Sequence, residues 1–461
     1  MPEPAHHPSS YRDPSGFVFQ HEGVFYRQID QSYAADYTLL MTSGLYNTLV
    51  EKKWLIAHRE LSHDEPSPTL PGHRHKTLLP AQLDVITYPY EWCFGQLKDA
   101  ALHTLEVLTE AMSYGMILKD ASPFNIQFVA GKPVFIDTLS FEKYDDSLPW
   151  VAYRQFCESF LFPLYLEHYT GIPLGKMLTA YPEGVPVGVT ARLLPWKTRL
   201  NPGVLMHVHL QNRIKGGAGE EKKPAFNQEK QKHIISHLQS IVRGLHSNAA
   251  ALSTWNNYYG ETILSRDYLS EKEKLFRHYL EDLSFRTALD IGANDGHFSQ
   301  VLSETAGTSI LSIDADHACI DRLYSTVKEK NIANVLPLCI DVLHPSAAIG
   351  FRNKERASFP DRFRTDLVVA LAVAHHLVLS GNIPMPDLAA FLADLTTHRL
   401  IIEFVPLEDP KARELIRNKS RYHEPYDAFF FEQCFLEYFL IEKKNKVAGT
   451  ERILYLMKKK P

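Results

Sequence analysis

The sequence predicts an α/β fold, in which a mainly parallel sheet closed by an antiparallel hairpin follows a separate α+β domain. Three observations indicate this. Residues 287–298 combine a strand, a glycine-containing turn and a helix start in direct succession. Apolar strands that end in acidic residues follow at intervals, and the chain closes with apolar, charged and apolar runs at 439–459. Strands that alternate with helices are typical of a parallel sheet covered on both faces.

The first strand and its turn are the most specific signal. The sequence TALDIGANDGHF places an apolar strand at 287–289 before Asp290, and Gly292 and Gly296 follow in the turn. Glycine lets the backbone approach a ligand closely, and the free N–H groups at a helix start bind anionic ligand atoms. An acid at the end of this strand suits a cationic amino group, such as that of S-adenosylmethionine (SAM), better than it suits NAD.

The next strands repeat the acidic ending. The second strand, ILSIDAD at 310–316, contains Asp314, which lies 24 residues after Asp290 and can accept hydrogen bonds from both hydroxyls of a ribose. The third strand, LPLCID at 336–341, ends in Asp341, which is placed to accept from an adenine amino group. The fourth strand and its exit loop are predicted at 366–377, and the fifth strand at 399–406.

With this order of elements, residues 281–461 resemble the class I SAM-dependent methyltransferases. The resemblance implies a Rossmann-like sheet of seven strands with an antiparallel final hairpin, and SAM as the cofactor. It also implies a set of cofactor-binding residues, namely Asp290, Gly292, Asn294, Gly296, Asp314 and Asp341. Asn294 stands where the family often has a third glycine, but asparagine tolerates left-handed backbone angles better than most residues. The alternatives are an inactive sheet of this type, or a sheet for another nucleotide.

Two histidines and one acid are the candidates for proton transfer to or from an acceptor. The acceptor side of such a sheet lies beyond the fourth strand, where His375 and His376 stand. Histidine can act as a base near neutral pH because its unperturbed pKa is about 6.5. We expect one of the two to point inward and the other toward solvent, and we favour His376 as the base; the alternative is a structural histidine bonded to the backbone. Glu403, at the end of the fifth strand, is a second candidate acid or base, or a stabiliser of the loop that follows it.

The first 200 residues contain a second candidate site. An amphipathic helix is expected at 97–115. In the segment MILKDASPFNIQF that follows, Asp120, Pro123 and Asn125 stand at the offsets of a protein-kinase catalytic loop, and Asp137 ends the next apolar run, VFID. The region therefore resembles the core of a kinase. The resemblance implies that Asp120 is the base and that Asn125 and Asp137 hold the metal of Mg-ATP.

Several residues depart from the kinase pattern. Lys119 stands where kinases usually have arginine, and Asp137 is followed by Thr-Leu rather than Phe-Gly. The hairpin expected at 17–29 has Gly23 as its single glycine, and it offers Arg27 rather than lysine as the cation that pairs with phosphate. These departures count against phosphotransfer, and the alternative to a kinase-like site is that these polar residues merely cap turns.

The sequence divides into a kinase-like domain at 1–200, a linker and helical segment at 201–280, and a methyltransferase domain at 281–461. Within the middle part we expect a strand at 206–210 (MHVHL), a linker at 215–224 and an amphipathic helix at 231–246. Aromatic residues before the first methyltransferase strand could pack on the sulfonium of SAM or cement the domain junction; these are Trp255, Tyr258, Tyr259 and Tyr268.

Composition limits the classes of function. The 461 residues exceed one ordinary domain, and 45% hydrophobic with 22% charged residues is typical of globular proteins. A net charge of −5 offers no electrostatic case for a nucleic-acid partner. Five cysteines without a CxxC pair favour a reducing, cytoplasmic setting. The N-terminus does not resemble a signal peptide, and the uncharged stretch 367–386 contains His-His and two prolines, so we expect no membrane span.

The whole chain also resembles a bacterial family of nodulation-type proteins with a class I methyltransferase domain. The shared features are SGLY, DASPFNIQF, FIDTLSF, AHHL and EFVP. The resemblance implies a SAM-dependent methyltransferase with a small-molecule, glycan or peptide acceptor, whose kinase-like domain serves recognition or as a scaffold. One alternative is a bifunctional enzyme that phosphorylates a hydroxyl and methylates the product. The other is a binding platform without catalysis.

Overall fold

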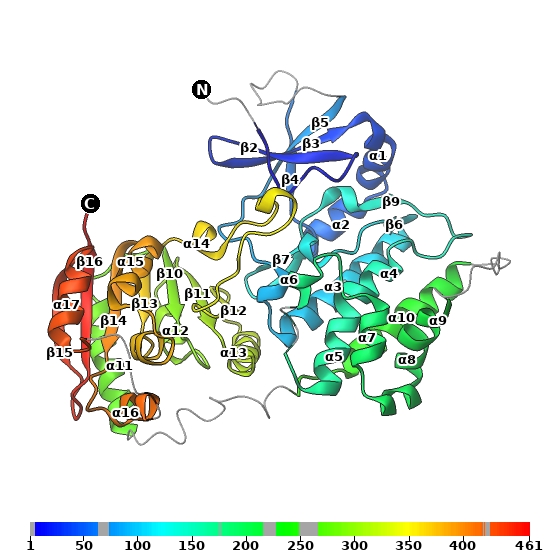
Figure 1. Ribbon diagram of the computed structural model, residues 1–461. Helices are drawn as coiled ribbons and strands as arrows, with labels where there is room; N and C mark the ends of the chain where they lie inside the picture. The colour runs from blue at the N-terminus through cyan, green and yellow to red at the C-terminus, as the bar shows by residue number, and fades with distance from the viewer. Residues whose placement is uncertain are drawn as a thin grey trace. The chain divides into compact units, whose positions relative to one another are not determined.

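The computed structural model describes residues 5–62, 73–173, 175, 177–214, 227–248, 266–417, 419 and 425–461. The chain divides into two compact units (Figure 1). The first consists of Met1–Leu252 together with Ala348–Ala357, and the second of Ser253–Ala347 and Ser358–Pro461. The linker expected at 215–224 and the aromatic residues Trp255, Tyr258 and Tyr259 lie outside the described residues.

The second unit is built on a seven-stranded sheet. In spatial order its strands are β12 (Val335–Cys339), β11 (Ser309–Asp314), β10 (Thr287–Ile291), β13 (Thr365–Ala370), β14 (Thr396–Phe404), β16 (Ile453–Lys459) and β15 (Phe439–Lys446). The first five are parallel, and the last two form an antiparallel hairpin on β14. The central strands are apolar and buried on both faces, as a covered parallel sheet requires.

Helices cover both faces of this sheet (Figure 1). The helices of this unit are α11 (Arg266–Leu280), α12 (His297–Ser303), α13 (His317–Glu329), α14 (Phe359–Arg362), α15 (Met385–Leu395), α16 (Pro410–Ile416) and α17 (Ala428–Leu436). Right-handed crossovers place α12 and α13 on one face and α15 on the other. In α13 the apolar side chains at helical spacing are buried against the sheet, and Asp316 caps the helix start by accepting from two backbone N–H groups.

The strand order reverses between β10 and β13. From β10 the chain proceeds outward through β11 and β12, and it then returns to the other side of β10 to form β13 and β14. At such a point neighbouring crossovers diverge to opposite faces, so a crevice opens at the carboxyl ends of the strands. A ligand site is therefore expected where β10, β11 and β13 end.

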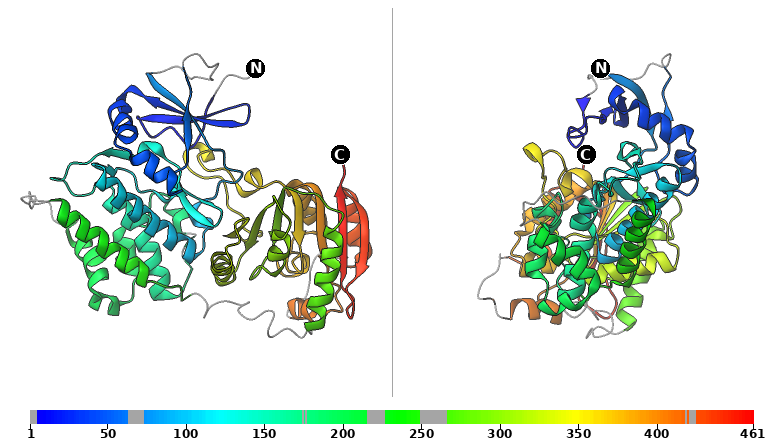
Figure 2. Two further views of the ribbon diagram at one scale, coloured as in Figure 1. Left: turned by 180° about the vertical axis from the view of Figure 1, so that it is seen from behind. Right: turned by 90° about the vertical axis from the view of Figure 1, so that its right-hand side faces the viewer.

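The first unit has a small antiparallel sheet at one end and helices at the other (Figure 2). In spatial order the strands of the sheet are β1 (Ala5–His6), β2 (Gly16–His21), β3 (Val24–Asp30), β5 (Arg74–Pro80) and β4 (His58–Glu60). Strands β2 and β3 form the hairpin expected at 17–29, with a positive φ of 81° at Gly23 in its turn.

Two small two-stranded sheets and a set of helices complete this unit. The strands are β6 (Met116–Leu118), which pairs with β9 (Phe141–Lys143), and β7 (Ile126–Val129), which pairs with β8 (Lys132–Phe135). The helices are α1 (Ala34–Thr42), α2 (Leu45–Glu51), α3 (Phe94–Ser113), α4 (Tyr153–Phe156), α5 (Phe162–Thr170), α6 (Met177–Ala180), α7 (Val187–Leu193), α8 (Pro202–Val204), α9 (Gln211–Ile214) and α10 (Gln228–Gly244). The amphipathic helices expected at 97–115 and 231–246 are α3 and α10, whose apolar faces pack together.

The prediction of a strand at 206–210 is wrong. Residues Leu205–Leu210 form a π-helical segment, η7, that continues α8 into α9. The alternation of apolar residues with His207 and His209 has the period of a strand, but tertiary packing overrides a pattern this short. His207 is buried, and its ring is hydrogen-bonded to the hydroxyl of Tyr153 (2.5 Å) and to the ring of His237 (3.2 Å).

The segment Ala348–Ala357 belongs to the first unit although it lies between β12 and β13 in the sequence. An isolated bridge between Ile349 and Arg356 closes it into a hairpin. The Arg356 guanidinium lies 4.3 Å from the ring centroid of Phe124, and the backbone N–H of Ala357 donates to the Tyr88 hydroxyl (3.0 Å). This crossing was not foreseen from the sequence.

Two further findings concern the sequence-based expectations about membranes and cysteines. Among the residues described, no helix is long and apolar enough to cross a membrane. All five cysteines are buried with free thiols.

Candidate functional site

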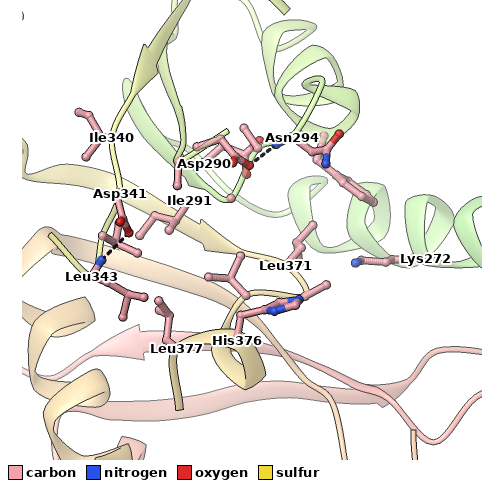
Figure 3. Close-up of a pocket in the computed structure, with 18 of the residues that line it drawn as sticks. Lys272, Asp290, Ile291, Asn294, Ile340, Asp341, Leu343, Leu371, His376 and Leu377 are labelled. Carbon is pink, nitrogen blue, oxygen red and sulfur yellow. Dashed lines mark hydrogen bonds between the residues drawn. The ribbon is translucent and has the colours of Figure 1, made fainter. Parts of the chain in front are cut away.

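A cavity of about 330 Å³ opens in the second unit at the carboxyl ends of β10, β11, β12 and β13 (Figure 3). The turn after β10 and the loops after the other three strands form its walls, and α11 closes one side. In Figure 3, Asp341 and Lys272 lie at opposite ends of this cavity, and His376 points toward it on the Lys272 side. The cavity thus occupies the position that the reversal of strand order predicts.

The turn after β10 is held in a left-handed conformation. Gly292 has a φ of 71°, and a Cβ added there would lie 2.2 Å from the Val373 side chain, so no larger residue fits. Asn294 has a φ of 52°, which fits the expectation that asparagine replaces a glycine at this position. Its backbone N–H donates to the Asp314 carboxylate (2.8 Å) and so ties the turn to the end of β11.

Gly296 has a packing role rather than a place in the cavity wall. It precedes α12 with a φ of 81°, and an added Cβ would lie 2.2 Å from a methyl carbon of Leu323 on α13. Gly292, Ala293 and Asn294 line the cavity, whereas Gly296 does not. Its proposed contact with a cofactor therefore has no support in the geometry.

Asp290, Asp314 and Asp341 all line the cavity. Asp290 is almost completely buried and accepts a hydrogen bond from the Ser299 hydroxyl (2.5 Å); burial raises its pKa to about 6. Burial also raises the pKa of Asp314, whose carboxylate accepts backbone hydrogen bonds from Asn294 and, at 2.9 Å, from Asp316. Asp341 accepts from the backbone N–H of Leu343 (3.0 Å).

Helix α11 contributes Tyr268, Leu269 and Lys272 to the cavity wall. The sequence pointed to Tyr268 but not to Lys272. The two residues lie four apart on one face of the helix, and Phe276, a further four along, is fully buried. This apolar stripe was the available signal, because a lysine within such a stripe faces the interior and needs a partner there.

Lys272 and Glu403 form a buried ion pair, with the ammonium nitrogen 2.5 Å from a carboxylate oxygen. Glu403 has no solvent exposure and also accepts from the Tyr268 hydroxyl (2.7 Å). Burial alone would raise the pKa of Glu403, but Lys272 and Arg452 hold it below its ordinary value. Arg452 in turn pairs with Asp409 (2.7 Å). Glu403 has partners on both oxygens and does not line the cavity, and its contacts join α11 to the sheet.

Of the two histidines, His375 points inward and is completely buried, whereas His376 is partly exposed and faces the cavity. His376 lines the cavity, and burial, followed by the charges of Arg452 and Lys411, lowers its pKa to about 4. His375 is completely buried, with a pKa well below its ordinary value, mainly because of burial. Neither ring nitrogen of His375 has a hydrogen-bond partner among the described residues. Both imidazoles are therefore neutral at neutral pH.

The candidate residues of the first unit also converge. Asp120 follows β6, Asn125 precedes β7 and Asp137 follows β8. The Asn125 side chain hydrogen-bonds Asp120 and donates to the Ser140 hydroxyl (3.2 Å), which itself donates to Asp137. Burial, and then the nearby charge of Asp137, raises the pKa of Asp120.

Two polar side chains complete this cluster. Arg27 on β3 forms an ion pair with Asp137, and the Gln155 amide donates to Asp120 (2.7 Å). In the part of the chain that the structure describes, no three His, Cys, Asp or Glu side chains gather in a way that could hold a metal ion. A metal at Asn125 and Asp137 would therefore need further ligands from a phosphate or water.

The chain is similar to known proteins in sequence and in structure. No protein-family model matches the chain. The nodulation protein NoeA of Rhizobium meliloti (strain 1021) is 29% identical over 98% of this chain and 96% of its own length. Among solved structures, the N-methyltransferase NodS of Bradyrhizobium japonicum WM9 in complex with S-adenosyl-L-homocysteine (SAH) is 14% identical, with 46% of this chain and 97% of NodS covered and a TM-score of 0.33. The kinase-methyltransferase WbdD is 20% identical, with 44% and 43% covered and a TM-score of 0.29.

Proposed function

We propose that the protein is a SAM-dependent methyltransferase that acts on a small-molecule, glycan or peptide acceptor. The observation that carries this proposal is the order of polar groups along one cavity. Asp341, Asp314 and Asp290 line it at the ends of the adjacent strands β12, β11 and β10. Figure 3 shows Lys272 on the far side of Asp290 from Asp341. An adenine amino group, a ribose and an amino acid part follow one another in SAM in the same order.

The residues present fit such a cofactor. The left-handed turn brings the backbone of Gly292 to the cavity wall, and a side chain at this position would meet Val373. We assign Asp314 to the ribose hydroxyls, Asp341 to the adenine amino group and Asp290 to the cationic amino group. Lys272 has three donors, so it can hold a ligand carboxylate while it keeps its bond to Glu403.

His376 is the candidate base on the acceptor side. When bound, SAM supplies the methyl group on an activated carbon, and the protein's task is to align the acceptor with it. A neutral imidazole can take a proton from a hydroxyl or an amine, and the low pKa of about 4 keeps His376 neutral at physiological pH. An acceptor that is already anionic would not need this base.

Equilibrium binding of SAM and SAH tests the proposal. Asp314→Asn keeps the shape of the side chain but removes its charge, so we expect affinity to fall roughly 10- to 100-fold, as for loss of hydrogen bonds to a charged group. Asp316→Asn is the matched control, since Asp316 is two residues away, caps α13 and does not line the cavity. Absence of binding by the unchanged protein, or an equal effect of both variants, would contradict the proposal and favour a platform without catalysis.

A second candidate function adds phosphate transfer in the first unit. The specific observation is that Asp120, Asn125 and Asp137 come together from three separate elements, with Arg27 paired to Asp137. This arrangement offers a base, two metal ligands and a cation for phosphate, as a kinase requires. The enzyme would then phosphorylate a hydroxyl and methylate the product.

Calorimetric titration of Mg-ATP into the SAH-saturated protein separates the two functions. We expect binding to disappear in Asp137→Asn but to persist in Asp146→Asn, a control at an exposed acid of the following loop. If the unchanged protein does not bind Mg-ATP, the first unit serves recognition and the methyltransferase proposal stands alone.

A further inference from the structure

One stretch of the first unit differs in charge from the rest of the chain. Residues 186–214 contain three arginines and one lysine but no aspartate or glutamate, whereas the whole protein carries a net charge of −5. Arg192, Lys197 and Arg199 are exposed. All the formal charge in this stretch is therefore positive, which favours an anionic partner over a cationic one.

The same stretch exposes large apolar side chains. Trp196 and Leu200 are 77% and 81% exposed, and Leu193, Leu205, Met206 and Leu210 are exposed as well. These six lie within 18 residues of sequence. The described part of the chain has 15 exposed large apolar residues in all, so this short stretch holds a large share of them. Scattered exposed apolar residues are ordinary, but a concentration of them marks an interaction surface.

The short helices that carry these residues pack against one another. The 3-10 helix Trp196–Leu200 (η6) packs on η7 and α8, and α7 packs on η7 and α9 (Figure 1). The inward face of these short helices is already satisfied, since Thr198, Val204 and Val208 are buried. Trp196 and Leu200 are therefore not part of the core. We call the exposed set Leu193, Trp196, Lys197, Arg199 and Leu200 the basic apolar surface.

The composition of this surface favours a lipid bilayer over a second copy of the chain. A symmetric dimer would place the same patch on both sides of the interface, so Lys197 and Arg199 would face like charges. Tryptophan and leucine beside lysine and arginine are typical of surfaces that lie in the headgroup region of a membrane. There the apolar side chains enter the acyl boundary while long basic side chains reach the anionic headgroups.

We propose that the basic apolar surface binds the headgroup region of an anionic lipid bilayer and attaches the protein peripherally to a membrane. The apolar side chains supply buried area, and the basic side chains supply attraction to anionic lipid. This inference is independent of the reaction in either unit.

Vesicle flotation with the full-length protein tests this inference. Vesicles of phosphatidylcholine alone are compared with vesicles that also contain phosphatidylglycerol, at low and at high salt. Lys197→Glu/Arg199→Glu alters the charge, and Trp196→Ser/Leu200→Ser removes the apolar anchor. Controls are Lys53→Glu/Lys458→Glu for the same change in net charge, and Phe429→Ser for removal of an apolar side chain that is 70% exposed elsewhere.

We expect partitioning onto phosphatidylglycerol vesicles that weakens with salt. Each basic residue near an anionic surface raises the partition coefficient roughly fivefold. The partition coefficient of the charge variant should therefore fall at least roughly 30-fold. The apolar variant should lose binding as well, and the controls should retain it. SAH affinity and the thermal unfolding midpoint, measured on every variant, distinguish lost membrane contact from misfolding.

Three outcomes would overturn the inference. The first is equal binding to both kinds of vesicle, or none. The second is equal loss in the control variants. The third is a concentration-dependent oligomer that Trp196→Ser/Leu200→Ser dissolves in the absence of vesicle binding, since this would assign the surface to a second copy of the chain.

Discussion

The buried pair of Lys272 and Glu403 yields the sharpest prediction about the second unit. Glu403→Gln removes the charge of Glu403 while it keeps the size of the side chain. The ammonium of Lys272, whose residue is only 4% exposed, then loses the carboxylate oxygen that lies 2.5 Å away. We therefore expect α11 to detach from the sheet more readily.

The expected magnitude follows from the cost of an unpaired buried charge. Removing one partner of a buried ion pair destabilises a protein by about 3–5 kcal/mol. Lys272→Met should cost less than Glu403→Gln, because Glu403 keeps the Tyr268 hydroxyl and has Arg452 at 3.8 Å. The double variant should be more stable than Glu403→Gln alone, since it leaves neither charge unpaired.

Hydrogen exchange of peptides from α11 measures this effect locally, without assuming that the two units unfold together. A loss of about 3 kcal/mol speeds exchange roughly a hundredfold. Glu271→Gln is the control on the same helix, because its pair with Lys274 is exposed, and such pairs contribute little.

Two results would refute the reasoning. Unchanged exchange in Glu403→Gln would mean that the pair does not hold α11. A double variant no better protected than Glu403→Gln would mean that the unpaired lysine is not the cause. If methyl transfer were lost in Glu403→Gln while α11 stayed protected, Glu403 would be an acid or base after all.

Three further predictions concern the cavity, its turn and the first unit. SAH affinity should weaken up to about tenfold when the pH falls from about 7 to about 5. The ionised carboxylate of Asp290 attracts the ligand's ammonium, and because the pKa of Asp290 is about 6, this carboxylate becomes protonated in that range. Calorimetry should find a flatter pH profile of SAH affinity in Asp290→Asn. Gly296→Ala should lower the thermal midpoint by at least roughly 2–4 °C, because a left-handed φ costs alanine about 1 kcal/mol and the methyl meets Leu323. Arg356→Gln should destabilise the first unit by about 1 kcal/mol, because the contact between the guanidinium and the Phe124 ring is lost. Denaturant unfolding, followed by hydrogen exchange of peptides from that unit, measures the effect. An unchanged stability would mean that this contact contributes nothing.

Local signals in the sequence were sufficient for the strands and for much of the cavity. Strands with acids at their ends have a period and a composition that single segments display, and parallel strands bring their carboxyl ends to one edge. Asp290, Asp314 and Asp341 could therefore be named together before any fold was known, and all three line the cavity. The spacing in DASPFNIQF likewise identified Asp120 and Asn125 as neighbours of Asp137.

Only the tertiary structure decided the partners of side chains that meet across the fold. Lys272 and Glu403 are 131 residues apart, and no local pattern shows that one neutralises the other. The burial of His375 depends on packing from several elements, as does the helix at Leu205–Leu210. The hairpin Ala348–Ala357 joins the first unit through contacts with residues more than two hundred positions away. Periodicity reports which face of one element is buried, but it carries no information about what lies opposite that face.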